Sequence, residues 1–295
     1  MSKEKDYIVR AISRDGKVRA FAIQSTQIVE NLRKRNDTWP VASAALGRTA
    51  SAAAMMGAML KGKERLSIQI KGGGPIGQII VDANALGEVR GIVTHPHIHF
   101  PLNDKGKLDV ARAVGTDGFL RVTKDLGLKE PYVGSIELIS GELGEDFTYY
   151  FAASEQTPSA VGVGVLVNED YSIRAAGGFI IQLLPGIKDS DIDEIEKKLS
   201  QIKPVSTMID QGMTPEEILC DILGEEDIEF LGTLEVVFSC HCSEERVEKA
   251  LITLGEDELK DMLTEGDTEI TCHFCNEKYE VKKAQLEKLI QLVKK

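Results

Sequence analysis

Four cysteines near the C-terminus lie in two short pairs whose spacing suits a single metal ion. The pairs are Cys240-His241-Cys242 and Cys272-His273-Phe274-Cys275, and 29 residues separate them. Zn²⁺ prefers four soft ligands in a tetrahedron, and each pair can supply one edge of it. Because four thiolates leave no open position for water, the ion would hold structure together rather than activate a nucleophile. The spacing therefore predicts a structural zinc site, with a redox-active zinc site as the alternative.

The rest of the composition is that of a protein with a full hydrophobic core and room for two domains. Of 295 residues, 42% are hydrophobic and 28% are charged. The charged start, residues 1–6, leads directly into a strand-like alternation, so we expect no secretory signal and a cytosolic protein whose thiols stay reduced. The weakly polar run over residues 41–60 contains Arg48. No membrane span is therefore expected.

The charge of the chain argues against a nucleic-acid partner. The net charge is −12, whereas phosphate binding needs a basic surface. Residues 231–295 repeat this sign, with 14 acidic against 9 basic side chains. Their only basic stretch is the expected last helix, residues 282–295, where lysines also suit the helix dipole. A zinc ribbon that binds nucleic acid is thereby disfavoured.

We predict an α+β fold that begins with an α/β sheet domain over residues 1–184. Asp15-Gly16, between two alternating segments, predicts a tight hairpin. Alanine, glycine and methionine crowd residues 38–60, so that helix is expected to be buried. The strands are expected at residues 7–13, 17–24, 66–71, 77–82, 88–93, 120–124, 132–139, 161–167 and 172–184, and the helices at 27–34, 38–60 and 146–154.

After Leu184-Pro185-Gly186 the sequence changes to short acidic helices, which predicts a helical linker over residues 185–231. Its first helix carries an apolar stripe that needs a partner surface; the stripe consists of Ile192, Ile195, Leu199 and Ile202. Thr214-Pro215-Glu216-Glu217 is a strong helix start, with a capping threonine and a glutamate three residues later. The zinc-binding domain is then expected over residues 232–295.

Three weaker signals have simpler explanations. Gly72-x-Gly74-x-x-Gly77 matches a dinucleotide-binding pattern, but a strand rather than a helix is expected next, so a turn explains the glycines better. His95, His97 and His99 alternate and would share one side of a strand, yet no carboxylate stands at a recognisable spacing for a metal site. Cys220 lies among apolar residues and is expected to be a small buried side chain.

Four separate stretches together resemble the heat-shock protein 33 family, also called the 33 kDa chaperonin family. They are Cys-His-Cys-Ser-Glu-Glu-Arg at 240–246, Leu-Ser-Ile-Gln-Ile-Lys-Gly-Gly-Gly-Pro at 66–75, Tyr-Phe-Ala-Ala-Ser-Glu-Gln-Thr-Pro at 150–158 and Ala-Ala-Gly-Gly-Phe-Ile-Ile-Gln-Leu-Leu-Pro at 175–185. The similarity spans nearly the whole chain and includes the C-x-C and C-x-x-C pairs. The histidine row and Cys220 do not belong to this pattern, so neither is assigned a role.

The resemblance implies an ATP-independent chaperone that holds unfolding proteins under oxidative and heat stress. It further implies one zinc ion per reduced chain, held by Cys240, Cys242, Cys272 and Cys275, and a homodimer in the active form. The oxidised form would carry the disulfides Cys240–Cys242 and Cys272–Cys275, although four cysteines by themselves allow three pairings. No nucleophile stands with a base, so we expect no catalytic residues and no enzyme.

Two other function classes remain open at this point. A constitutive zinc-ribbon adaptor would use the same cysteines for architecture alone, and oxidant would not change its activity. A metal hydrolase built on His95, His97 and His99 would need a second metal equivalent. Neither class implies a membrane or a nucleic acid.

Overall fold

The structure, a computed structural model, describes residues 5–293 and divides into two compact units. The units are Met1–Ser239 and Cys240–Lys295. The first four residues of the charged start and the last two lysines of the predicted final helix lie outside the described residues. Each unit has its own apolar core, so each is described by itself.

Unit Met1–Ser239 is built on two sheets. The first has the order β10-β1-β2-β9-β8, with β1 (Tyr7–Ser13), β2 (Val18–Gln24), β8 (Ser159–Val167), β9 (Ile173–Leu183) and β10 (Ile228–Glu235). The second has the order β11-β5-β4-β3-β6-β7, with β3 (Arg65–Lys71), β4 (Gln78–Asn84), β5 (Glu88–Val93), β6 (Phe119–Asp125), β7 (Tyr132–Glu137) and β11 (Val237–Phe238). The predicted strands and the hairpin at Asp15-Gly16 are confirmed, with small shifts at their ends. The glycine-rich segment is the predicted turn, between β3 and β4.

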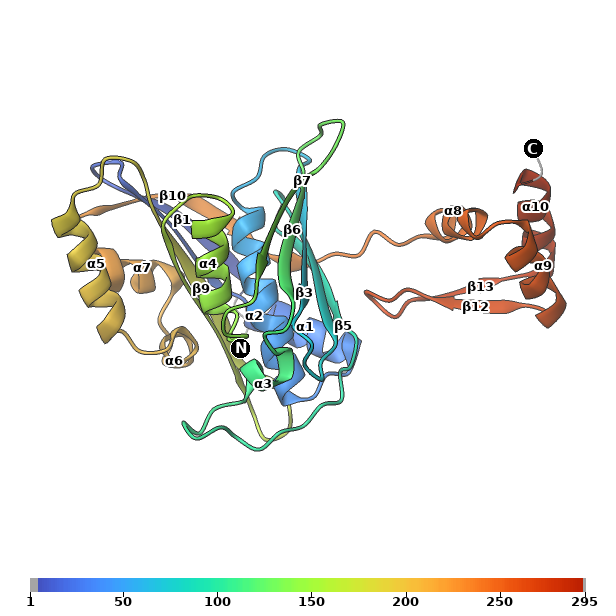
Figure 1. The fold of residues 1–295 in the computed structure, drawn as a ribbon, viewed down its shortest axis with the longest axis horizontal. Helices are drawn as coiled ribbons and strands as arrows, with labels where there is room; N and C mark the ends of the chain where they lie inside the picture. The colour runs from blue at the N-terminus through green and yellow to red at the C-terminus, as the bar shows by residue number, and fades with distance from the viewer. Residues whose placement is uncertain (1–4, 294–295) are drawn as a thin grey trace. The chain divides into compact units, whose positions relative to one another are not determined.

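Helix α2 (Pro40–Gly57) lies between the two sheets and is almost entirely buried, as predicted (Figure 1). Its small side chains let strands approach from both sides. At Gly47, an added Cβ would lie 2.5 Å from Val29 Cγ1 and 2.8 Å from Val165 Cγ2, closer than real Cβ atoms come. A helix that is buried on nearly every side can be largely apolar without entering a membrane. Among residues 5–293, no helix has the length and apolarity needed to cross one.

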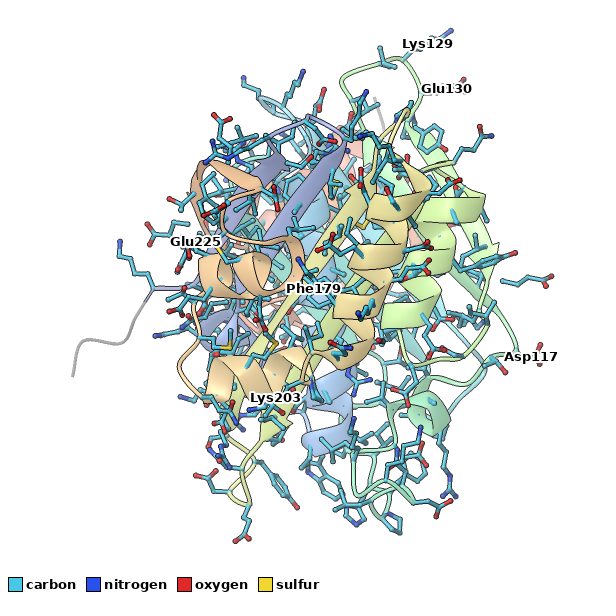
Figure 2. All side chains as sticks on the ribbon, turned by 90° about the vertical axis from the view of Figure 1, so that its left-hand side faces the viewer. Asp117, Lys129, Glu130, Phe179, Lys203 and Glu225 are labelled. Atoms are coloured by element: carbon cyan, nitrogen blue, oxygen red, sulfur yellow. The ribbon has the colours of Figure 1, made fainter. Side chains whose placement is uncertain are left out.

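The remaining helices of this unit cover the sheets from outside or flank α2. They are α1 (Thr26–Asn36), α3 (Val110–Val114), α4 (Gly144–Ala153), α5 (Asp189–Gln201), α6 (Val205–Asp210) and α7 (Pro215–Leu223). The α5–α7 layer covers the face of the first sheet that points away from α2, with Phe179 of β9 beneath it (Figure 2). The predicted capping box of α7 is present: Glu217 N donates to Thr214 Oγ1 and Thr214 N donates to Glu217 Oε2.

The sequence predicted a helical linker that ends at residue 231, but the structure has two strands, β10 and β11, around this boundary. The expected start of the zinc-binding domain, residue 232, falls inside β10, and contacts divide the chain after Ser239 instead. The reason is backbone pairing: β10 runs antiparallel along β1, with Leu234 opposite Ile8, and β11 pairs in parallel with β5. Residues 185–239 therefore pack as part of the first unit.

Asp6 connects three elements at the start of β1. Its Oδ2 accepts a hydrogen bond of 2.6 Å from Ile28 N in the first turn of α1, whose own N-cap residue, Ser25, makes no capping bond. Its backbone carbonyl accepts from Val236 N, just after β10. The side chain is buried, and Oδ1 has no hydrogen-bond partner among residues 5–293. Burial raises the pKa of this carboxyl to about 7, against the opposing effect of the hydrogen bonds from the backbone of Ile28 and Gln27.

We predict that Asp6→Asn changes how stability depends on pH. The folded-state pKa lies above the ordinary value of 3.8, so the folded protein holds this proton more tightly. The contribution of Asp6 to stability therefore falls as pH rises from about 4 to about 7. The variant lacks this loss, so its stability relative to wild type should rise across that window, by up to about 4 kcal/mol. Urea unfolding near pH 4 and near pH 8 measures it. A stability difference that does not change with pH would contradict the prediction.

Candidate metal centre

Unit Cys240–Lys295 is a small domain with a modest core. It contains α8 (Glu244–Leu254), α9 (Glu256–Glu265), the hairpin of β12 (Thr268–Thr271) and β13 (Lys278–Val281), and α10 (Lys283–Val293). Its buried apolar side chains are Leu251, Leu259, Val281, Leu286, Leu289 and Ile290. None of the four cysteines of this unit belongs to that cluster. The sulfur atoms therefore lie outside the apolar core of their own domain.

Each cysteine pair is held in place by the element next to it. Cys240 and Cys242 lie on an extended segment that leads into α8, where Ser243 Oγ accepts from Arg246 N and caps the helix. Cys272 and Cys275 lie on the turn between β12 and β13. There Cys272 N donates to the carbonyl of Glu277, and Asn276 N donates to the carbonyl of Cys272. The left-handed backbone of Asn276, with a φ of 59°, turns the chain back toward β13.

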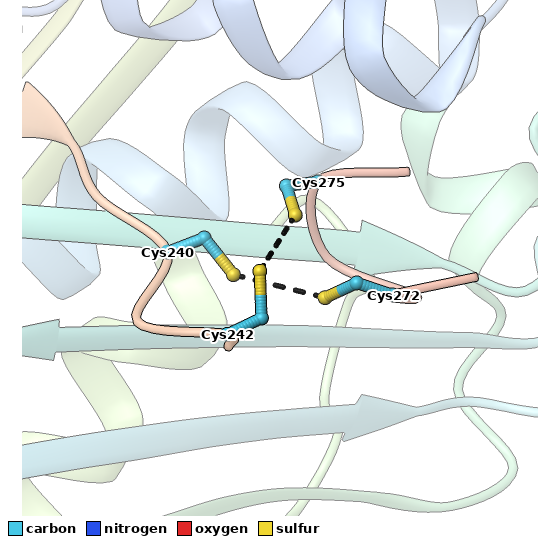
Figure 3. Close-up of side chains that lie close together, drawn as sticks. All are labelled: Cys240, Cys242, Cys272 and Cys275. Carbon is cyan, nitrogen blue, oxygen red and sulfur yellow. Dashed lines mark hydrogen bonds between the residues drawn. The ribbon is translucent and has the colours of Figure 1, made fainter. Parts of the chain in front are cut away.

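The four sulfur atoms come together at the spacing that a tetrahedral zinc ion needs. All lie within 4.8 Å of one another, with Cys240 Sγ 3.7 Å from Cys272 Sγ and Cys242 Sγ 3.2 Å from Cys275 Sγ (Figure 3). Zn–S bonds of about 2.3 Å imply sulfur–sulfur edges of about 3.8 Å in a tetrahedron. A disulfide would need about 2.05 Å, and none of the four cysteines is part of a disulfide. The residues present therefore fit a closed Zn(Cys)₄ site.

Two of the four sulfur atoms hold their protons tightly when no cation neutralises them. Burial raises the pKa of the Cys242 thiol and of the Cys275 thiol above their ordinary range. A hydrogen bond with Cys242 likewise raises the pKa of the Tyr279 hydroxyl. Sulfur at this site therefore binds a metal only by giving up its proton, as thiolate sites generally do.

Sequence spacing did not reveal the residues around the sulfur atoms. Tyr279 on β13 makes a side-chain hydrogen bond with Cys242, and Asn276 sets the turn. The one available signal for Asn276 was its type, since asparagine tolerates a left-handed backbone better than most residues. No local sequence pattern indicates that Tyr279 lies beside Cys242, because two helices, α8 and α9, separate them along the chain.

The other candidates behave differently from the cysteine cluster. His95, His97 and His99 are exposed on an irregular segment after β5, and His97 Nε2 lies 2.9 Å from Asp37 Oδ2. Within residues 5–293, the four cysteines form the only group of histidine, cysteine and acidic side chains close enough to share a metal ion. Cys220 is half-buried on α7 rather than buried as expected, because α7 places it at the rim of its apolar face. Burial and nearby glutamates raise the pKa of its thiol.

Known proteins resemble this chain over nearly its full length. The family model described as Hsp33 protein matches residues 6–282. The 33 kDa chaperonin of Geobacillus kaustophilus is 59% identical over 291 residues, which cover 98% of this chain and 99% of the relative. That of Bacillus subtilis is 58% identical over 285 residues, with 96% and 98% covered. A crystal structure of the 33 kDa chaperonin from Thermotoga maritima superposes with a TM-score of 0.91 at 38% identity, covering 98% of this chain and 99% of that one.

We predict that Cys240→Ser abolishes tight zinc binding, whereas Cys220→Ser leaves it intact. A serine hydroxyl is a poor zinc ligand, and the loss opens the closed set. Cys220 lies in the other compact unit and serves as the matched control. Zinc released per chain, titrated against a chelator of known affinity, measures both variants. Wild-type affinity in Cys240→Ser would mean that the ligand set is different.

Proposed function

Because the chain belongs to the Hsp33 family of stress-response chaperones, we propose that it is an ATP-independent holdase switched by oxidation of its four-cysteine centre. The reduced protein would be inactive with one zinc ion per chain; the oxidised, zinc-free protein would bind unfolding proteins. The observation that carries this proposal is the cluster of four cysteine sulfur atoms, all within 4.8 Å of one another and none in a disulfide. We place the protein in the cytosol, where thiols are reduced until oxidant arrives.

The chemistry of the switch follows from the state of the sulfur atoms. When bound, zinc would supply the positive charge that keeps the four cysteines as thiolates, the form that oxidants attack. Two thiolates give two electrons to the O–O bond of hydrogen peroxide, which takes up two protons and leaves as two water molecules, and a disulfide forms. A sulfur in a disulfide is no longer a thiolate ligand. The activity needs no catalytic residue in the chain.

We propose that oxidation unfolds the C-terminal unit because its core is small. Metal binding to such modules contributes roughly 10–16 kcal/mol, which is also folding free energy. The pairs Cys240–Cys242 and Cys272–Cys275 would close very short loops, worth on the order of 1–2 kcal/mol in chain entropy. Six buried side chains are a limited reserve against this loss.

The α5–α7 layer is the surface that we propose to become available to clients. None of the residues of α5 is buried, and Ile195, Leu199 and Ile202 pack only partly against the core beneath them. Cavities of about 340 and 420 Å³ border this helix on the sides of Leu223 and Met213. A segment with so little buried area can open locally at low cost. The apolar faces would then bind unfolded chains, with a homodimer as the proposed active form.

We predict that hydrogen peroxide with mild heating releases one zinc per chain and raises suppression of client aggregation. Metal counting and light scattering of a denaturing client, first in reductant and then in peroxide, measure both. Retained zinc with activity unaffected by oxidant would instead support a constitutive zinc-ribbon adaptor. A second metal that resists oxidant would support the hydrolase reading of the histidine row. Suppression that is independent of zinc release would contradict the switch.

We also predict that the oxidised chain carries the disulfides Cys240–Cys242 and Cys272–Cys275. In the folded centre, Cys240 Sγ lies 3.7 Å from Cys272 Sγ and Cys242 Sγ lies 3.2 Å from Cys275 Sγ, so sulfur atoms of the two loops also lie close together. Disulfides between those pairs would tie the loops together and oppose unfolding. Peptide mapping by mass spectrometry, with free thiols blocked beforehand, distinguishes the pairings. Cross-loop disulfides in the active protein would contradict the proposed route to unfolding.

A further inference from the structure

Residues 228–239 connect the edges of both sheets immediately before the first cysteine of the centre. β10 forms the edge of the first sheet along β1, and β11 forms the edge of the second sheet along β5. Val237 lies opposite Glu88 and Phe238 opposite Val89. The same short stretch of chain thus closes two sheets, and Cys240 follows it directly.

Backbone bonds hold residues 236–239, which we call the strap, along the edge of β5. Val237 N donates to the carbonyl of Gly87 at 2.9 Å, and Ser239 N donates to that of Val89 at 3.2 Å. Ser239 Oγ adds a bond of 3.1 Å to Glu88 Oε1. The chain passes so close to the turn before β5 that a Cβ on Gly87, at a φ of +80°, would lie 2.1 Å from the carbonyl oxygen of Glu235.

Phe238 is the side chain that seats the strap. Its ring lies 4.2 Å from the guanidinium carbon of Arg35 on α1 and packs partly against the core. An open pocket of about 330 Å³ borders the strap, lined by Asp6, Arg35 and Phe238 among others. A two-residue strand at a sheet edge beside an open pocket has few contacts, so it opens more easily than the strands beside it.

We propose that the strap transmits the state of the cysteine centre to the first unit, with Phe238 as its latch. This inference rests on the proposed redox switch and names the segment that carries its signal. While the C-terminal unit is folded, residue 240 is confined and the short β11 keeps its pairing. When that unit unfolds, the chain end gains conformational freedom, and two strand residues are too few to resist it.

Release of the strap would reach the α5–α7 layer through the chain itself. Beyond Val236 lies β10, which pairs with β1, and Tyr7 on β1 donates a hydrogen bond of 2.7 Å to Glu216 of α7. Fraying of β10 from its C-terminal end therefore loosens β1, one of the two strands on which α7 packs. This route requires no contact between the C-terminal unit and the helical layer.

The test compares Phe238→Ala with Phe230→Ala in the reduced, zinc-loaded full chain. Phe230 lies in the same segment but is exposed on β10, so it is the matched control. Phe238→Ala should keep one zinc, exchange the amides of Val237 and Ser239 at least about tenfold faster, and suppress client aggregation without oxidant. Ser239→Ala, which loses only the bond to Glu88, should shift exchange in the same direction by less.

The outcomes separate the strap from the switch. If peroxide does not activate wild type, the proposed function fails. The strap is overturned, and the switch stands, if peroxide activates the wild type while Phe238→Ala and Phe230→Ala show the same amide exchange and the same suppression of client aggregation. Loss of protection in α5–α7 before residues 236–239 in the oxidised wild type would also overturn it. If Phe238→Ala does not fold, Ser239→Ala replaces it in the test. Amide exchange of residues 236–239 in Ser239→Ala at the wild-type rate would then overturn the strap.

Discussion

Burial of α2 between two sheets is the constraint on which the first unit depends. Small side chains on the surface of this helix let it contact sheets on both sides. At Gly47 the helix lies directly against Val29 of α1 and Val165 of β8. Because α2 occupies the inner faces, the first sheet has its outer face free for the α5–α7 layer. The central helix therefore determines that the α5–α7 layer lies outside the main core rather than within it.

The C-terminal unit has the opposite balance. Its apolar core is small, its sulfur atoms lie outside that core, and the proposed ion contributes more to its folding than any short disulfide can replace. Stability that rests on one centre can be removed by changing that centre. In a large domain, the same oxidation would remove only a fraction of the total folding free energy. The proposed switch therefore depends on the size of the domain as much as on the reactivity of its thiols.

Local patterns predicted most of the elements because burial and capping act over a few residues. The alternation around Asp15-Gly16, the small residues of α2 and the capping box at Thr214 each indicated the structure that formed. The cysteine cluster was also predictable, because two chelating pairs need only come together. Strands β10 and β11 were missed: residues after 228 followed acidic helices, and nothing nearby indicates pairing with strands more than a hundred residues earlier.

Residue types and their spacing were enough to identify the cysteines that can bind zinc, the buried helix and the family of the chain. Long-range contacts were needed to show where the first unit ends, that the two cysteine pairs meet, and that Asp6 rather than Ser25 caps α1. The physical reason is range. Periodicity and capping residues show which side chains of a segment are buried and which backbone groups need a hydrogen bond. The segment that covers those side chains or bonds those groups is known only once distant parts of the chain come together.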